Sequence, residues 1–256
     1  MLLATALVPQ LRLVFADEFD IEGRPNPANW TYERGFVRNK ELQWYQPENT
    51  WVEKGRLIIE GRRERIRNSN FVSGSEDWRK NREFADYTSA AIETRGLHSW
   101  KFGRFEIKAK IVPKQGLWPA IWTLGVNGPW PSNGEIDLLE FYQDTILANT
   151  AYGSGGGIWN TGKTPIAEFL KLDPKWAEGF HVWQMDWDER KIKLSIDGRL
   201  LNETDIAGTL NKDGKNPCLQ PHFLILNLAI GATGGDPSAT TFPTRFEVDY
   251  VRVYQN

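Results

Sequence analysis

The sequence predicts an all-β protein in which two antiparallel sheets pack face to face as a sandwich. Most of the chain consists of short runs in which apolar and polar residues alternate, separated by Gly, Pro, Asn and Asp. Helical signals are few, because no stretch longer than about ten residues keeps a helical period without a Gly or Pro. Strands with one apolar face must bury it, and two sheets packed against each other are the usual way to do so.

Five alternating runs are the clearest strands, and one of them ends in a turn signal. Asp197-Gly198 separates the run KIKLSI from RLLNE, which is typical of a tight β-hairpin. The five runs are 57–60 (LIIE), 103–111 (GRFEIKAKI), 181–186 (HVWQMD), 191–196 (KIKLSI) and 246–254 (FEVDYVRVY).

Two segments are expected to be long loops. Residues 62–86 are rich in charged and polar side chains and lack periodicity, so they are predicted to lie on the rim of the sandwich. Residues 152–165 (YGSGGGIWNTGKTP) are rich in glycine and carry Trp159. Long loops inside a compact domain are more often functional than decorative.

Length and charge exclude several classes of protein. The 256 residues are expected to form one domain over 1–256, with the apolar run 1–9 as a trimmed leader or cloning remnant that is too short to span a bilayer. The 31 basic and 33 acidic residues are mixed along the chain and give a net charge of -2, so neither a nucleic-acid nor a membrane partner is expected. The single cysteine, Cys218, allows no disulfide within the chain.

The most informative stretch is GEIDLLEF at 134–141, which follows the aromatic run GLWPAIW at 116–122. On a strand, Glu135 and Asp137 project to the same side, whereas Glu140 has the wrong parity. Glu140 can join the other two acids only if the strand carries one extra residue, a β-bulge near Leu138-Leu139. The sequence therefore predicts three carboxylates on one face of a bulged strand.

Such a cluster has the properties of a glycosidase site. Carboxylates packed closely cannot all ionise freely, so at least one pKa should rise, as a general acid requires. If the outer pair approaches to about 5–5.5 Å, the geometry is that of a retaining enzyme. We assign Glu135 as nucleophile, Glu140 as acid/base and Asp137 as the acid between them that shares a proton. The competing hypotheses for this cluster are a solvated acidic strand and a metal site.

Other catalytic arrangements fit the sequence less well. The three histidines, His98, His181 and His222, are not in the spacing of a zinc motif. There is no GxSxG nucleophile elbow, and the glycines of GSGGG at 153–157 are not followed by the Lys-Ser/Thr of a phosphate-binding loop.

The sequence resembles family 16 glycoside hydrolases, the concanavalin-like jelly-roll β-glucanases, and in particular the bacterial endo-β-1,3-glucanase (laminarinase) branch. The resemblance covers nearly the whole chain, and its most specific element is the acidic motif E-x-D-x-x-E after WPAIW. The segments that carry it are FADEFD (15–20), NKELQWY (39–45), YTSAAIETRGLHSWKFG (87–103), GLWPAIWTLG (116–125), GEIDLLEF (134–141), FLILNLAIG (223–231) and FEVDYVRVY (246–254).

The resemblance implies a catalytic domain with a concave substrate cleft and a retaining, covalent mechanism that cuts internal β-1,3 or mixed β-1,3/1,4 linkages of β-glucan without a catalytic cofactor. It gives Glu135, Asp137 and Glu140 the roles assigned above. It also makes Trp118 and Trp122 the sugar platform, with Trp130 and Asn39 as further cleft residues. A secreted or periplasmic monomer is expected.

The sequence departs from the laminarinases at two places. Ala91 stands where they usually carry an Arg, and ANTAYG at 148–153 replaces their Gly-Thr-x-His-Trp stretch, so that Asn149 or Tyr152 is expected to take the place of the missing histidine. The glucan is therefore left open, and a marine galactan is a second candidate substrate. Two further hypotheses on the same fold are a carbohydrate-binding module without activity and a transglycosylase.

Many relatives in this family hold a structural calcium ion on the convex face, far from the cleft. The resemblance implies Glu18, the carbonyl of Gly55 and Asp249 as its ligands. The competing hypothesis is that Asp249 merely alternates outward in its strand.

Overall fold

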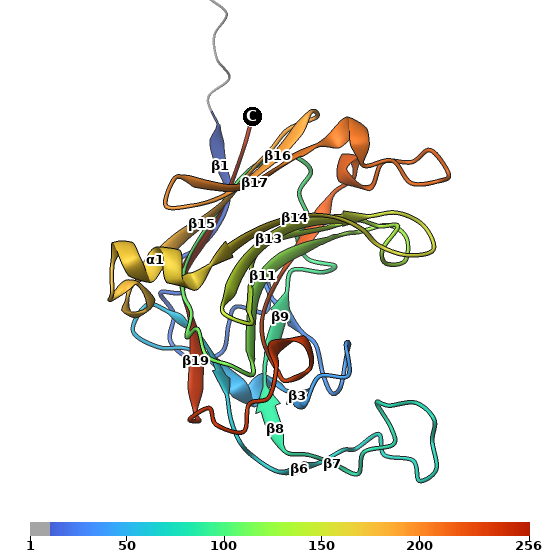
Figure 1. Cartoon of the computed structure of the whole chain (residues 1–256), viewed down its shortest axis with the longest axis vertical. Coiled ribbons are helices and arrows are strands. Elements are labelled where there is room, and N and C mark those ends of the chain that lie inside the picture. The colour runs from blue at the N-terminus through green and yellow to red at the C-terminus, as the bar shows by residue number, and fades with distance from the viewer. Residues whose placement is uncertain (1–10) are drawn as a thin grey trace, which may run out of the picture.

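The computed structural model describes residues 11–256, and the expected leader at 1–9 lies outside this part of the chain. Two large antiparallel sheets form a sandwich, and helices are short (Figure 1). The predicted jelly-roll class is confirmed.

The first large sheet forms one layer of the sandwich and has the strand order β17-β16-β15-β10-β19-β5-β4, with β1 also paired to β19. Asp197 and Gly198, both with positive φ, form the two-residue turn between β16 and β17, so the predicted hairpin is confirmed. The strands are β1 (Arg12–Asp17), β4 (Thr50–Val52), β5 (Leu57–Gly61), β10 (Gly103–Lys110), β15 (His181–Trp187), β16 (Lys191–Ile196), β17 (Arg199–Asp205) and β19 (Thr244–Gln255).

The second large sheet carries the acidic motif and has the order β14-β13-β12-β11-β18-β9-β2. Its long strands β11, β13 and β14 are visibly curved (Figure 1). The strands are β2 (Thr31–Tyr32), β9 (Ala91–Glu93), β11 (Leu117–Gly125), β12 (Glu135–Tyr142), β13 (Thr145–Tyr152), β14 (Ile158–Pro165) and β18 (His222–Ile230).

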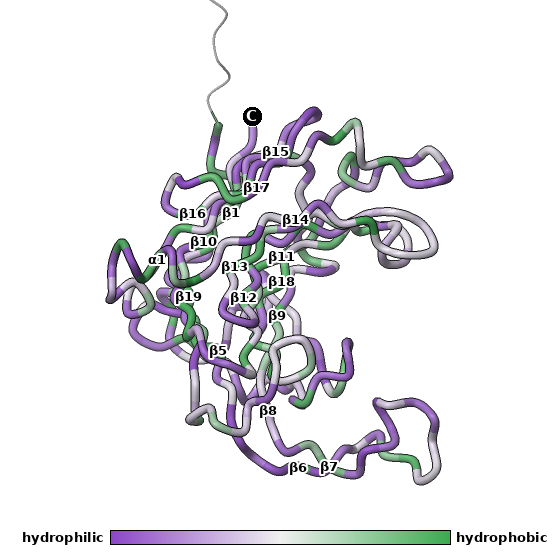
Figure 2. Tube along the Cα trace, in the orientation of Figure 1, coloured by the Kyte–Doolittle hydropathy of each residue, from purple (hydrophilic) through white to green (hydrophobic). Residues whose placement is uncertain are grey.

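The core lies between these two sheets. In β10, Phe105, Ile107 and Ala109 are buried and alternate with partly exposed polar residues, as a strand with one apolar face requires. Strand β18 is buried at every position, because both of its faces are covered. One of them contributes Phe223 and Ile225 to a small apolar cluster separate from the main core. Hydrophobic stretches follow the strands, and most turns are hydrophilic (Figure 2).

The two predicted loops turn out differently. Residues 62–86 are mostly irregular, with one short antiparallel pair, β6 (Ile66–Arg67) and β7 (Phe84–Ala85). The prediction for 152–165 was wrong beyond Gly157, because β14 pairs with β13 along its whole length. The glycine-rich stretch at 153–157 made the following strand look like part of a loop. Alternate residues of this strand, Trp159, Thr161 and Lys163, face the same side of the sheet.

The smaller elements sit around the two sheets. Strands β3 (Gln43–Tyr45) and β8 (Tyr87–Ser89) pair in parallel, and α1 (Ile166–Leu172) follows β14. The 3₁₀ turns are η1 (Pro47–Asn49), η2 (Trp176–Glu178), η3 (Ile206–Gly208), η4 (Pro217–Leu219) and η5 (Ala232–Gly234). Within residues 11–256, no helix has the length and apolar character needed to cross a membrane.

Candidate active site

Strand β12 contains the predicted bulge. Asp137 lies opposite Asn149 of β13 and Glu140 opposite Leu147, so β12 advances three residues where β13 advances two. The same shift appears against β11, and Leu138 and Leu139 are both fully buried. The extra residue restores the parity of Glu140, which therefore shares a face with the other two acids.

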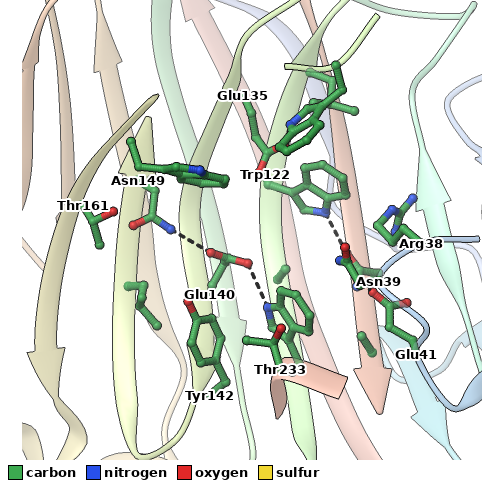
Figure 3. Close-up of a pocket in the computed structure, with 18 of the residues that line it drawn as sticks. Arg38, Asn39, Glu41, Trp122, Glu135, Glu140, Tyr142, Asn149, Thr161 and Thr233 are labelled. Atoms are coloured by element: carbon green, nitrogen blue, oxygen red, sulfur yellow. Dashed lines mark hydrogen bonds between the residues drawn. The ribbon is translucent and has the colours of Figure 1, made fainter. Parts of the chain in front are cut away.

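The two outer acids of the cluster face a cleft of about 580 Å³ (Figure 3). Glu135 and Glu140 line the cleft, and Asp137 is buried between them with 1% of its surface exposed. The side chain of Glu140 points into the cleft and not into the apolar interior. This placement meets the condition on which the catalytic hypothesis depends.

Hydrogen bonds hold each outer acid in a fixed position. The indole N–H of Trp118 donates to Oε1 of Glu140 over 2.8 Å, and that of Trp130 donates to Oε2 of Glu135 over 2.6 Å. The amide of Asn149 donates to both Asp137 Oδ2 (3.0 Å) and Glu140 Oε2 (2.7 Å). Asn149, one of the two residues expected to replace the missing histidine, thus lies within the cluster.

Burial raises the pKa of every acid in the cluster, and repulsion from neighbouring carboxylates adds to this for Asp137 and Glu140. Burial raises the pKa of Glu135 to about 7, against the opposing effects of the Trp130 hydrogen bond and the Arg38 charge. Burial and the charge of Glu135 raise the pKa of Glu140 to about 8. Burial and both glutamates hold the pKa of Asp137 well above its usual range. Both outer acids thus titrate well above the usual range of a carboxyl group, so the pair can hold one proton near neutral pH.

Aromatic residues line the cleft in two groups, which include the predicted Trp118, Trp122 and Trp130. Trp118 lies beside Glu140 and meets the ring of Tyr142 edge-on at 5.4 Å, while Trp122 is 8% exposed and donates its N–H to Asn227 over 2.7 Å. Trp130 is 52% exposed, and its ring lies 6.5 Å from that of Trp159. Four indoles therefore face a site that holds two outer carboxylic acids.

The segment from Arg38 to Glu41 forms the opposite wall from Thr161 (Figure 3). Asn39 and Lys40 both have φ of 55°, a left-handed conformation that is uncommon for residues other than glycine. This turn lets Arg38 lie 5.0 Å from the centre of the Trp122 ring and lets Asn39 donate to Glu41 over 3.2 Å. Asn39 is thus in the cleft as predicted.

Comparison with known proteins decides the family. Residues 41–252 match the sequence profile of glycosyl hydrolases family 16. The chain belongs to this family. A beta-glucanase from Rhodothermus marinus is 35% identical over 271 aligned positions, which cover 96% of this chain and 86% of that protein.

Two solved structures show how closely this family 16 glycoside hydrolase follows the fold. One comes from a study of endo-acting O-glycanases that members of the human gut microbiota express to initiate mucin breakdown; it has a TM-score of 0.87 and 35% identity and covers 96% of this chain and 91% of that one. The other is the catalytic domain of a laminarinase from Thermotoga petrophila, with a TM-score of 0.79, 32% identity and coverage of 97% and 99%.

The loop at 62–86 packs against the segment Arg38–Glu41 and supports this wall of the cleft. Arg82 donates to the carbonyl of Glu41 over 2.8 Å and lies 3.6 Å from the centre of the Phe36 ring. Arg79 donates to the carbonyl of Val37 over 3.1 Å. The loop thus fixes the backbone on both sides of the left-handed turn.

Several cleft residues were not predicted from the sequence, and one residue that was predicted to line the cleft lies elsewhere. Tyr152, at the end of β13, is not among the described residues that line the cleft. Since Tyr152 comes three residues after Asn149, it projects to the other side of the strand. The residues missed include Arg38, Glu41, Tyr142, Trp159, Thr161, Lys163 and Asn227. The alternation of 159, 161 and 163 was the one available signal.

The residues predicted to bind calcium have other partners. Glu18 accepts two hydrogen bonds from Arg252, at 2.7 and 2.8 Å, and Asp249 lies 2.7 Å from the ammonium of Lys108. Among residues 11–256, no group of three or more His, Cys, Asp or Glu side chains is placed to hold a metal. In this structure both carboxylates are therefore paired with basic side chains. Calcium binding stays a prediction of the resemblance, which a higher melting temperature in calcium than in EGTA would support.

Proposed function

We propose that this family 16 glycoside hydrolase is a retaining endo-glycosidase that cuts internal β-1,3 or mixed β-1,3/1,4 linkages of a β-glucan. The observation that carries the proposal is the cluster of three acids at an indole-lined cleft, in which burial raises the pKa of both outer glutamates. Beta-glucanases and laminarinases among the relatives support a glucan as the first candidate.

In this mechanism Glu135 attacks the anomeric carbon while Glu140 gives its proton to the departing glycosidic oxygen. The bond from carbon to the leaving sugar breaks as the bond to the Glu135 carboxylate forms. Water then attacks the same carbon and loses its proton to Glu140, which releases Glu135. Asp137 offers a proton to share with its neighbours, and the Trp118 and Asn149 hydrogen bonds hold Glu140 in place.

The shape of the site suits an internal cut. Cleft residues lie on both sides of the acids, from Arg38 and Asn39 on one wall to Thr161 and Lys163 on the other. A chain can therefore be held on both sides of the bond that is cut. Alternatively, a sugar hydroxyl in place of water would resolve the intermediate and make the enzyme a transglycosylase.

A second candidate substrate is a galactose-containing chain, such as a mucin O-glycan or a marine galactan. Two observations favour it. The TM-score with the structure from the O-glycanase study is 0.87, against 0.79 with the laminarinase. Asn149 also stands within the stretch where laminarinases carry a histidine, so the cleft differs beside the acids.

A substrate panel tests the proposal. We expect release of reducing ends from laminarin or barley β-glucan as a ladder of oligosaccharides, and loss of at least a thousandfold in kcat for Glu135→Gln, because the nucleophile is removed. Cleavage of mucin O-glycans or galactans alone would favour the second candidate. Binding without any product after long incubation would favour a carbohydrate-binding module, and longer products at high acceptor concentration would indicate transglycosylation.

The cellular location and the oligomeric state of the enzyme are also proposed. A polysaccharide is too large to enter a cell intact, so we place the enzyme outside the cytoplasm, secreted or periplasmic. We expect it to act as a monomer, which light scattering on the purified protein would check against the mass of 29.3 kDa.

A further inference from the structure

Two exposed tryptophans flank the cleft beyond the acids. Trp159 is 45% exposed and Trp130 is 52% exposed, and both line the same cleft as Glu135. Their ring centres are 6.5 Å apart and their planes meet at 51°. Large aromatic side chains that stay this exposed next to a polar site are typical of a binding surface.

The two indoles have different surroundings. The N–H of Trp130 is fixed by Glu135 Oε2 at 2.6 Å. Trp159 projects from β14, opposite Ala151 of β13, and its indole nitrogen lies over Gly157. A Cβ at position 157 would come within 2.8 Å of that nitrogen, so a glycine there leaves room for the ring. The hydrogen bond thereby orients the Trp130 ring before any substrate arrives, and the glycine lets the Trp159 ring lie close to the backbone at 157.

We propose that Trp159, together with Trp130, is a stacking site for a sugar ring of the substrate, on the β14 side of the acids. The occupant is an uncharged pyranose that lays its C–H face on the indole, and the site is continuous with the cleft that holds Glu135. This inference rests on the proposed function and adds a specificity-determining residue to it. The enzyme is then expected to prefer chains long enough to reach Trp159.

The chain supplies a matched control in the adjacent residue. Ile158 is 52% exposed on the same strand and is not among the described residues that line the cleft. Trp159→Ala and Ile158→Ala both remove an exposed apolar side chain from β14, so neither should change stability by much. Only the first should affect binding of a long chain.

The test measures kinetics and binding together. For the polymer of the panel that the parent enzyme cuts, Trp159→Ala should raise KM about tenfold with kcat nearly unchanged, since stacking away from the reacting bond contributes uniform binding. Trp159→Phe should restore part of the loss, and Ile158→Ala should behave as the parent. In the Glu135→Gln background, calorimetry with a hexasaccharide of that polymer should show the same loss of affinity, independent of NaCl concentration because the sugar is uncharged.

The outcomes separate this inference from the proposed function. Cleavage and hexasaccharide binding that are unchanged in Trp159→Ala would overturn the stacking site while leaving the proposed function in place. An equal loss in Ile158→Ala, or affinity that falls steeply with salt, would also overturn it. A parent enzyme that cuts no polymer of the panel would remove the proposed function and this inference with it.

Discussion

The indole N–H of Trp118 donates to the carboxyl of Glu140 over 2.8 Å. The resemblance assigns Trp118 only a flat surface for sugar, yet this contact also ties it to the proposed acid/base. Donation to the ionised form of Glu140 lowers its pKa, in opposition to burial. A residue of the aromatic segment WPAIW therefore influences the pKa of a residue of the acidic motif.

Replacing Trp118 by Phe should keep a ring in the cleft and remove the hydrogen bond. The pKa of Glu140 should then rise further, so the alkaline limb of kcat/KM should move to higher pH, and kcat should fall about tenfold as the acid loses its orientation. Rate measurements from pH 5 to 10 would check this. Trp51→Phe, on β4 of the other sheet, is the control. An alkaline limb that stays in place would contradict the coupling.

The pH profile of the unmodified enzyme follows from the two outer acids. Glu135 must be ionised, so activity should rise as pH increases through about 7, and Glu140 must be protonated, so activity should fall as pH increases through about 8. A plot of kcat/KM against pH should therefore be a narrow bell-shaped curve. A plateau that extends past pH 10 would be incompatible with Glu140 as the acid.

Stability should depend on pH in the opposite sense from that of a salt-bridged acid. The folded-state pKa of Glu140, about 8, lies above the unfolded value of about 4.3, so its contribution is fully present below the unfolded pKa and is lost as pH rises through the folded pKa. Glu140→Gln should therefore melt close to the parent at pH 5 and several degrees higher at pH 9. Calorimetry would check this, with exposed Glu189→Gln as the control. A lower melting temperature for Glu140→Gln at pH 9 would refute the assignment.

The wall at Arg38–Glu41 should loosen when its support is removed. Arg82→Met takes away the donor to the Glu41 carbonyl and the contact with Phe36, so KM should rise several-fold with a smaller change in kcat. Arg67→Met lies in the same loop and has Glu83 as its ion-pair partner, which makes it a matched control. Equal effects of the two variants would mean that the loop does not hold the wall.

Much of the fold and the centre of the site could be predicted because they depend on local pattern. The period of two places Glu135 and Asp137 on one face, and the parity of Glu140 demands the bulge that β12 contains. The strand at 158–165 was missed because the glycines before it resemble a loop. Its pairing with β13 is a tertiary contact that local sequence does not encode.

The rest of the site depends on contacts between distant segments. Arg38 and Glu41 reach the cleft through a left-handed turn at Asn39 and Lys40, which has no glycine to mark it in the sequence. The support from Arg82 spans 41 residues. The bond from Asn149 to Glu140 likewise requires the register of β12 against β13. Such contacts depend on how the strands are arranged in the fold, which the local sequence pattern does not specify.

The stereochemistry of the first product tests the central claim most directly. Proton NMR recorded within minutes of adding enzyme to the polymer that it cuts distinguishes the two anomers of the new reducing end. Glu135 as nucleophile and Glu140 as acid/base predict the β-anomer first, with the α-anomer growing only by mutarotation. An α-anomer as the first product would show inversion and would contradict the account of the acids on β12.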